Sequence, residues 1–322
     1  MPAPLKVLFL GSGPIAAPIL QALAASKLVN LCGVATQPDR PAGRKRIPTP
    51  TPLGAAAAEL GIDALRVHDV NGAEFMEYAA ALAPDMICVV SFGQILKVPL
   101  LELPRFNCIN VHASLLPRYR GASPIAQCLL NRDNATGVAF MQMEKGLDSG
   151  AVYKMLELPL KGIEYADSLE IRLGELAASV AAETLCDIAA GKLIGTPQDQ
   201  AKVTICRKIS KRDGRIDWND SAADIEAMSR AYYPWPGALC EVRLPGGRET
   251  VLNICKARVL SATPLAPGEI AELAGKLVIG CGKNSALEID ELIPAGAKRT
   301  TAAAFRNGLR GELPEVLQGI EI

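Results

Sequence analysis

The stretch Leu5-Lys6-Val7-Leu8-Phe9-Leu10-Gly11-Ser12-Gly13-Pro14 decides the fold class of this chain. A compact apolar run ends in a glycine turn, and an alanine-rich pattern with helical spacing follows to about Ala25. A strand, a glycine turn and a helix in this order are typical of the opening of a parallel α/β domain. Pro14 fits the first helical turn, where the backbone amide that proline lacks would have no partner.

Strand and helix patterns alternate along the residues that follow. Strands are predicted over 29–35, 64–67, 86–90 and 108–111, and as a pair over 137–143 and 152–158. Helices are predicted over 52–60, over 71–82 and, as one long helix, over 166–190. Because strands alternate with helices, the predicted fold class is α/β with a Rossmann-like, mostly parallel sheet.

The pattern changes beyond residue 190. Gly195-Thr196-Pro197 and a basic run predict a linker, and Ser221 is expected to cap a helix over 221–231. After Pro234-Trp235-Pro236-Gly237, short strands are predicted over 239–244, 251–259, 276–281 and 286–292. Such strands, punctuated by Gly and Pro, indicate a small β-barrel similar to an oligonucleotide-binding (OB) fold. The predicted domains are a Rossmann-like domain at 1–190, a basic linker at 191–208 and a C-terminal β-barrel at 209–322.

The composition argues against several classes of protein. Lys+Arg and Asp+Glu both number 34 in 322 residues, so a polyanion site would have to come from local clustering of cations. Nine cysteines without a Cys-x-x-Cys pair argue against a disulfide framework or a zinc site and for a reducing compartment. No signal or transit pattern follows Met1, and no apolar segment reaches membrane-spanning length. We expect a soluble, cytoplasmic monomer without a metal.

Polar side chains gather at the end of the strand predicted over 108–111. Asn110 and His112 lie two residues apart, so in a strand both side chains point to the same face. An amide donor beside a titratable ring suits the stabilisation and transfer of charge at a carbonyl carbon. The alternative is that these residues merely cap the next turn. Ligands of open α/β sheets gather at the carboxyl ends of strands, so the corner at residues 92–96 is expected on the same rim.

A carboxylate is expected to reach this rim from the turn Gly146-Leu147-Asp148-Ser149-Gly150. Asp148 is otherwise a simple turn aspartate, a role that its residue type also favours. The chain has one further histidine, His68, which follows a predicted strand and is expected at the surface.

The glycine turn supports a rival interpretation. Gly11-Ser12-Gly13-Pro14-Ile15-Ala16 approximates a G-x-G-x-x-G/A dinucleotide fingerprint, and Asp39 and Arg40 follow the second predicted strand. An NADP-dependent oxidoreductase would use Arg40 for the ribose phosphate. Asp39 lies deeper in a loop than that fingerprint requires, which favours a tight structural turn.

A long segment between residues 36 and 52 is rich in proline and basic side chains. It includes Thr36-Gln37-Pro38-Asp39-Arg40-Pro41-Ala42-Gly43-Arg44-Lys45-Arg46 and runs on to Pro52. Loops of this length inside a domain are commonly functional, so we predict a mobile binding loop rather than a solvated connector.

Several motifs carry a family resemblance. Asn110-x-His112-x-Ser114-Leu115-Leu116-Pro117-x-x-Arg120-Gly121, followed by Gly146-Leu147-Asp148-Ser149-Gly150, resembles the signature of the 10-formyltetrahydrofolate-dependent formyltransferases. Within that superfamily, Gln37-Pro38-Asp39-Arg40-Pro41-Ala42-Gly43-Arg44 is similar to the tRNA-acceptor loop of the methionyl-tRNA formyltransferases. Arg215-Ile216-Asp217-Trp218 and Pro234-Trp235-Pro236-Gly237-Ala238 are similar to the second-domain landmarks of that family.

The resemblance implies formyl transfer from 10-formyltetrahydrofolate to methionyl initiator tRNA in translation initiation. It implies a catalytic trio of Asn110, His112 and Asp148. It further implies a folate pocket lined by Ser114, Leu115, Leu116 and Pro117 and by Phe92, Gly93, Gln94, Ile95 and Leu96. Arg44 matches the loop arginine that engages the acceptor end of the tRNA. The other cations expected to hold the tRNA are Arg40, Lys45, Arg46, Lys208 and Lys211.

The chain departs from the family pattern at three places. The family usually has Gly-Thr-Pro after the first strand, where Gly11-Ser12-Gly13-Pro14 stands here, and Lys97 and Tyr233 replace a usual proline and asparagine. None of these changes removes a member of the trio. Besides the oxidoreductase, two rival functions are a sugar-nucleotide formyltransferase, which would share the trio's chemistry, and a non-catalytic RNA-binding module using the barrel alone.

Overall fold

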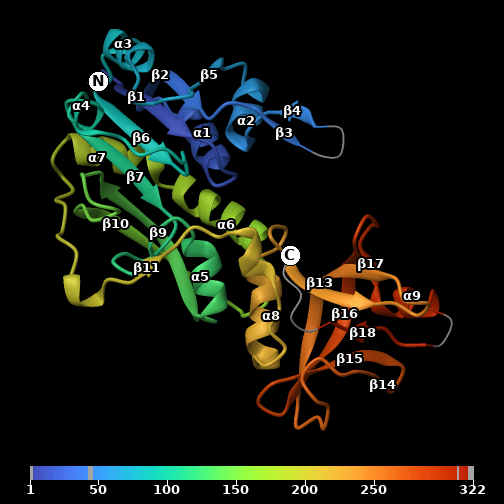
Figure 1. Cartoon of the computed structure of the whole chain (residues 1–322). Coiled ribbons are helices and arrows are strands. Elements are labelled where there is room, and N and C mark those ends of the chain that lie inside the picture. Colours follow the sequence, from blue (N-terminus) through green and yellow to red (C-terminus); the bar gives the residue numbers. More distant parts are fainter. Residues whose placement is uncertain (1–2, 43–45, 310–311, 318–322) are drawn as a thin grey trace. The chain divides into compact units, whose positions relative to one another are not determined.

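The computed structural model describes residues 3–42, 46–309 and 312–317 (Figure 1). The contacts within the chain divide it into two compact units. Unit 1 comprises Met1–Pro124, Ala135–Pro159 and Ser168–Cys206. Unit 2 comprises Ile125–Asn134, Leu160–Asp167 and Arg207–Ile322.

A seven-stranded sheet forms the centre of unit 1. Its spatial order is β10 (Val152–Pro159), β9 (Ala135–Gln142), β7 (Cys108–His112), β6 (Met86–Val90), β1 (Leu5–Gly11), β2 (Val29–Thr36) and β5 (Ala64–Arg66). The strands from β7 to β5 are parallel, and β9 and β10 are antiparallel additions at one side. The helices of the unit are α1 (Ala16–Ala25), α2 (Pro52–Glu59), α3 (Ala73–Leu82), α4 (Val98–Leu101), α6 (Ala166–Ala178, from Ser168 onward) and α7 (Ala181–Ala189). The predicted α/β class with a mostly parallel sheet is confirmed.

The centre of this sheet explains where its polar residues gather. All five residues of β6 are buried, as expected for a parallel strand covered on both faces. On one face, Ile87 and Val89 of β6 join Leu8 and Leu10 of β1 in a core that includes Phe75 of α3. The register places Val89 beside Asn110 of β7, so β6 and β7 end at the same edge of the sheet.

Two predictions of local structure were wrong. The helix predicted over 166–190 is interrupted between α6 and α7, where the Ser179 hydroxyl donates to the Leu176 carbonyl (2.7 Å). The amide of Val180 then bonds to Ala177 (3.2 Å), three residues back, which tightens and ends the helical turn. The segment 36–52, predicted as a loop, contains the antiparallel pair β3 (Arg40–Ala42) and β4 (Ile47–Thr49).

Unit 2 is built on an antiparallel sheet. Its order is β14 (Ile270–Leu273), β15 (Lys276–Cys281), β16 (Ser285–Pro294), β13 (Glu249–Ser261), β12 (Ala238–Arg243) and β18 (Glu315–Val316), with β17 (Thr300–Thr301) beside β16. Helices α5 (Pro124–Leu130, from Ile125 onward), α8 (Ala222–Ala231) and α9 (Ala302–Asn307) belong to the same unit. The Ser221 side chain accepts from the Asp224 amide and caps α8 as predicted. The small C-terminal β domain is therefore also confirmed.

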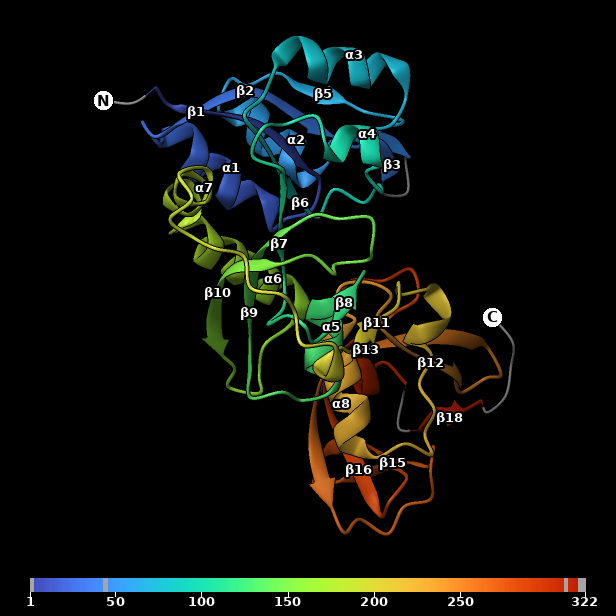
Figure 2. The same cartoon turned by 90° about the vertical axis from the view of Figure 1, so that its left-hand side faces the viewer.

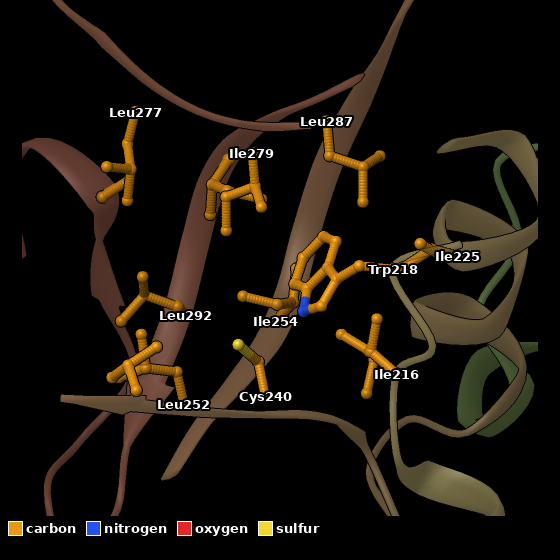
Figure 3. Packing of buried hydrophobic residues seen from close by; sticks show 14 of the residues in the cluster. Ile216, Trp218, Ile225, Cys240, Leu252, Ile254, Leu277, Ile279, Leu287 and Leu292 are labelled. Atoms are coloured by element: carbon orange, nitrogen blue, oxygen red, sulfur yellow. The ribbon is translucent and has the colours of Figure 1, made fainter. Parts of the chain in front are cut away.

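A tryptophan lies in the core of unit 2. Irregular pairing of β13 with β16 near Lys256 strengthens the local twist, and the sheet curls around its apolar side chains. Trp218 is 5% exposed and packs among Ile216, Ile225 and Ile254 (Figure 3). Cys240 belongs to the same cluster, and burial raises the pKa of its thiol to about 12.

The cysteines form no disulfide bonds within the described residues. All nine cysteines are free thiols, and all nine lie in the described part of the chain. No helix within residues 3–42, 46–309 and 312–317 is long and apolar enough to cross a membrane.

The two tryptophans of the chain provide a test of the unit 2 core. Trp218→Ala is expected to lower the free energy of unfolding by about 3–5 kcal/mol, because it leaves a cavity among buried side chains. Trp235 is 56% exposed, so Trp235→Ala is the matched control and is expected to cost about 1 kcal/mol or less. Urea denaturation followed by circular dichroism measures both. Equal losses would contradict the assignment of Trp218 to the core.

Candidate active site

Asn110 and His112 lie on β7, between β6 and β9. Asn110 pairs with Val89 of β6 on one side and with Met141 of β9 on the other. The backbone of Asn110 is thus fixed from both sides, and its half-buried carboxamide makes no hydrogen bond to any described residue. This side chain retains its donors for a bound group.

His112 is held in one orientation by the loop that follows its strand. The side chain is 6% exposed, and its Nε2 lies 2.9 Å from the carbonyl oxygen of Tyr119. A carbonyl oxygen only accepts, so Nε2 carries a hydrogen in this arrangement. The other ring nitrogen, Nδ1, lies 3.7 Å from Oδ2 of Asp148. That separation suits charge attraction rather than a direct hydrogen bond.

Asp148 reaches the histidine from the turn between β9 and β10. Its backbone is left-handed (φ 45°), a conformation that aspartate tolerates better than most residues. Its Oδ2 accepts from the Gly121 amide (2.8 Å). The turn thus directs the carboxylate toward both the amide of the adjoining loop and the imidazole of His112.

The loop between β7 and α5 depends on two residues with positive φ. Tyr119 has φ 60° and Gly121 has φ 114°. A Cβ atom on Gly121 would lie 2.2 Å from the carbonyl oxygen of Cys206, so this position requires glycine. The Leu116–Pro117 peptide is cis, and the Ser114 hydroxyl donates to the Arg118 carbonyl (2.6 Å).

The residues of the predicted folate motif at 114–117 have unequal access to solvent. Ser114 and Leu116 are buried, and Leu116 packs with Ala139, Met141 and Val152. Leu115 and Pro117 are partly exposed. The first pair therefore shapes the loop from inside, whereas the second pair contributes to its surface.

The predicted folate corner at 92–96 also divides into core and surface. Phe92 and Leu96 belong to the buried core of unit 1. Gln94 donates to the Val67 carbonyl and accepts from the Val70 amide, each at 2.9 Å, which fixes the corner to the neighbouring segment. Gly93 and the side chain of Ile95, which is 83% exposed, are left to offer contacts at the surface.

The backbone groups of the glycine turn after β1 are hydrogen-bonded to other residues of unit 1. The Gly13 amide donates to the Ser91 carbonyl (3.3 Å), and the Ser12 carbonyl accepts from the Leu53 amide (3.3 Å). At the start of α1, the Ile15 amide donates to a carboxylate oxygen of Glu170 (3.4 Å), where a dinucleotide would place its pyrophosphate. These contacts favour a structural turn over a cofactor site.

The predicted tRNA-binding cations lie in three places. Arg40 is on β3, where it donates to the Gln37 side chain (2.6 Å), and Arg46 is exposed directly before β4. Arg44 and Lys45 lie outside the described residues. Lys208 and Lys211 are exposed in unit 2. Within the described ranges, no group of three or more His, Cys, Asp or Glu side chains is placed to hold a metal ion.

Residues around the trio to which the sequence analysis assigned no individual role also contribute to this geometry. Arg120 is buried, and its Nε donates to Oε1 of Gln198 (2.9 Å). The side-chain amide nitrogen of Gln198 in turn donates to the Asp148 carbonyl oxygen (2.8 Å). Thr204 accepts from the Tyr119 amide (2.8 Å). Gln198 and Thr204 lie within or beside the predicted basic linker pattern, and a single sequence contains no periodicity that singles them out.

Gly121 provides a direct test of the loop geometry. Gly121→Ala is expected to cost about 1–3 kcal/mol more than Gly191→Ala, because overpacking against Cys206 is added to left-handed strain. Gly191 is the matched control, since its φ is also positive (68°) and no atom lies within 4 Å of its added Cβ. Thermal unfolding of the two variants measures the difference. An equal loss in both would show that residue 121 has room for a methyl group.

Comparison with known proteins identifies the family. The Formyl transferase model matches residues 5–185, and the model of the Formyl transferase C-terminal domain matches residues 208–310. A methionyl-tRNA formyltransferase of Methylococcus capsulatus is 41% identical over 304 residues, which are 94% of this chain and 96% of that protein. The Geobacter sulfurreducens protein of the same name is 39% identical over 311 residues, 96% of each chain. A solved N-formyltransferase from Helicobacter canadensis, in complex with folinic acid and dTDP-3-aminofucose, has a TM-score of 0.62 at 16% identity and covers 88% of this chain and 98% of its own. The chain belongs to the formyl transferase family.

Proposed function

We propose that this chain transfers the formyl group of 10-formyltetrahydrofolate to the amino group of methionyl initiator tRNA. The product is N-formylmethionyl-tRNA, which is used to initiate translation in the cytoplasm, and the enzyme acts as a monomer. The observation that carries the proposal is 41% identity across 94% of the chain to a protein named methionyl-tRNA formyltransferase. The placement of His112 and Asp148 within 3.7 Å of each other, next to Asn110, supports it.

The reaction begins with attack of the uncharged α-amine of methionine on the N10-formyl carbon. The new C–N bond produces a tetrahedral oxyanion, which collapses when the bond from carbon to N10 of the folate breaks. The N–H groups of the Asn110 carboxamide make no hydrogen bond to a described residue, so they can donate to this oxyanion. A donor directed at such an oxyanion typically contributes roughly 2.7–4 kcal/mol to the stability of the transition state.

We assign His112 and Asp148 to stabilising the developing charge and transferring the proton of the attacking amine. Because Nε2 is bonded to the Tyr119 carbonyl, the Nδ1 atom is the ring position that donates to the oxyanion or receives the proton of the attacking amine. The Asp148 carboxylate at 3.7 Å stabilises the imidazolium that carries both protons. The proton finally leaves with N10 of the tetrahydrofolate product or with solvent.

The folate is bound along the rim formed by residues 92–96 and 114–117. Gly93, Ile95, Leu115 and Pro117 are the accessible members of these stretches, and Ser114, Leu116, Phe92, Gln94 and Leu96 hold the rim from within. The folinic acid named in the Helicobacter canadensis complex supports a folate as the formyl donor. No step of this reaction requires a metal ion.

The tRNA is bound by cations of both units. Residues 1–190 form the catalytic domain, 191–208 a basic connection, and 209–322 the tRNA-binding β domain. Arg44 engages the acceptor end, with Arg40, Lys45 and Arg46 beside it in the sequence, and Lys208 and Lys211 add phosphate contacts. Such contacts release counterions, so binding weakens steeply as salt is added.

The rival functions have less support. The dTDP-3-aminofucose named in the Helicobacter canadensis complex belongs to a protein 16% identical to this chain, whereas the Methylococcus capsulatus methionyl-tRNA formyltransferase is 41% identical. An oxidoreductase would need the α1 start, where the Glu170 carboxylate already binds the Ile15 amide. A non-catalytic RNA-binding module would leave the His112–Asp148 pair without a purpose.

The trio is tested by formylation assays with methionyl initiator tRNA. Asn110→Ala is expected to lower kcat by about 10²–10³-fold while folate still binds, because it removes a donor to the transition state. His112→Ala should lower kcat at least as much, whereas the exposed His68 offers the control, and His68→Ala should keep the parental rate. A parental rate for Asn110→Ala with folate bound would refute the oxyanion assignment.

The acceptor loop is tested by comparing its arginine with a cation elsewhere. Arg44→Ala is expected to raise KM for the tRNA severalfold and to reduce its salt dependence, with the Kd for folate unchanged. Lys27→Ala removes one positive charge from an exposed position after α1 and should change neither constant. Equal losses of tRNA and folate binding in Arg44→Ala would instead mean that the loop supports the fold.

A further inference from the structure

Residues 196–206, here called the strap, run along the Asp148 turn and the loop that follows His112. At one end Thr196 and Val152 exchange backbone hydrogen bonds at 2.9 Å, next to the Asp148 turn. At the other end β11 (Ile205–Cys206) pairs in parallel with β8 (Arg120–Gly121) (Figure 2). The strap therefore contacts both the Asp148 turn and the loop that follows His112.

Gln198 links the strap to the Asp148 turn. It is 9% exposed and is the single buried residue between 191 and 205. Its Nε2 donates to the carbonyl oxygens of Asp148 (2.8 Å) and Gly150 (2.7 Å). Its Oε1 accepts from Nε of Arg120 (2.9 Å). Two carbonyls can only accept and a guanidinium can only donate, so the amide has one satisfactory orientation.

Thr204 links the strap to the His112 side of the site. Its Oγ1 accepts from the Tyr119 amide (2.8 Å), and its carbonyl accepts from the Arg120 amide (2.9 Å). The carbonyl of the same Tyr119 accepts from Nε2 of His112. One residue therefore separates the strap from the imidazole.

Cys206, two residues after Thr204, also holds this loop. The Cys206 sulfur lies 3.5 Å from the Tyr119 carbonyl and 3.4 Å from the Arg120 carbonyl. Burial raises the pKa of the Cys206 thiol, so it remains protonated and donates to these oxygens. Its own carbonyl accepts from the Ala122 amide (3.2 Å).

Both positions held by the strap have an unfavourable backbone conformation. Tyr119 and Asp148 are non-glycine residues with φ 60° and 45°. Such conformations are unfavourable for residues other than glycine and persist where surrounding contacts fix them. The hydrogen bonds from Thr204 and Gln198 reach the backbone of these same two residues.

From these contacts we infer that the strap is a positioning element of the active site. Gln198 sets the backbone of Asp148, Thr204 sets the carbonyl that orients His112, and together they maintain the separation of the imidazole and the carboxylate. Neither residue contacts substrate. The inference rests on the proposed function, because its effect is read in the rate of formyl transfer.

The Gln198 side is tested with Gln198→Glu in two backgrounds. The glutamate keeps an acceptor for Arg120, whereas it loses the donors to the Asp148 and Gly150 carbonyls. In the parental enzyme, kcat should fall at least 10-fold, with KM for both substrates within 2-fold. In an Asp148→Asn background, the same change should alter the single-turnover rate by less than 2-fold, because Gln198 acts through Asp148. A merely structural role would lower the rate by the same factor in both backgrounds and would overturn the inference.

The Thr204 side is tested with a pair of variants that differ in one hydroxyl. Thr204→Val lacks the acceptor for the Tyr119 amide and should lower kcat at least 5-fold, while Thr204→Ser keeps the acceptor and should restore most of the rate. Ile205→Thr, at a strap position 71% exposed, is the control and should match the parental enzyme. Equal rates for Thr204→Val and Thr204→Ser would overturn the role of this hydroxyl.

A spectroscopic measurement separates this inference from the proposed function. With only two histidines in the chain, ¹⁵N-histidine labelling gives separate signals for His68 and His112. His112 should be a single Nε2–H tautomer when neutral in the parental protein and a mixture in Thr204→Val, with His68 unchanged. An unchanged His112 spectrum would overturn the strap's role. Absence of formylation by the parental protein with the expected spectra would instead overturn the proposed function alone.

Discussion

The hydrogen bond from Nε2 of His112 to the Tyr119 carbonyl is the constraint on which the proposed site depends. It fixes the tautomer of the ring, because the carbonyl accepts and cannot donate. Nδ1 then faces the Asp148 carboxylate at 3.7 Å. If the ring turned or Tyr119 moved, the imidazole and the carboxylate would no longer face each other. The proposed chemistry therefore depends on a backbone atom seven residues further along the chain.

The rest of unit 1 keeps that arrangement in place. The fully buried β6 fixes β7 on one side and β9 fixes it on the other, so Asn110 and His112 project from a rigid strand. The opposing groups come from loops, whose left-handed residues Tyr119 and Asp148 are bonded to the strap at 196–206. Placing the proposed catalytic groups on a strand and fixing the opposing loops with hydrogen bonds is a common way to make an active site rigid.

The features that could be predicted from the sequence are those with a local pattern. Apolar runs and helical spacing predicted the parallel sheet and the C-terminal β domain, because burial follows those periods. The pair β3–β4 was missed because each strand has only three residues and contains a proline. The break after Ala178 was missed because only the hydroxyl of a single serine accompanies it. Gln198 was missed because its partners lie 50 and 78 residues away in the sequence, which leaves no periodic signal. Phe92 and Leu96 resemble pocket residues in sequence, yet their side chains lie in the core.

The central claim is that this site formylates methionyl initiator tRNA, and competition between acceptors tests it most directly. The protein would be incubated with 10-formyltetrahydrofolate, methionyl initiator tRNA and a dTDP-amino sugar in equal amounts, and both formylated products would be quantified. The account predicts that N-formylmethionyl-tRNA forms and that the sugar nucleotide remains unmodified. Formylation of the sugar alone, or of neither acceptor by folded protein at saturating donor, would contradict it.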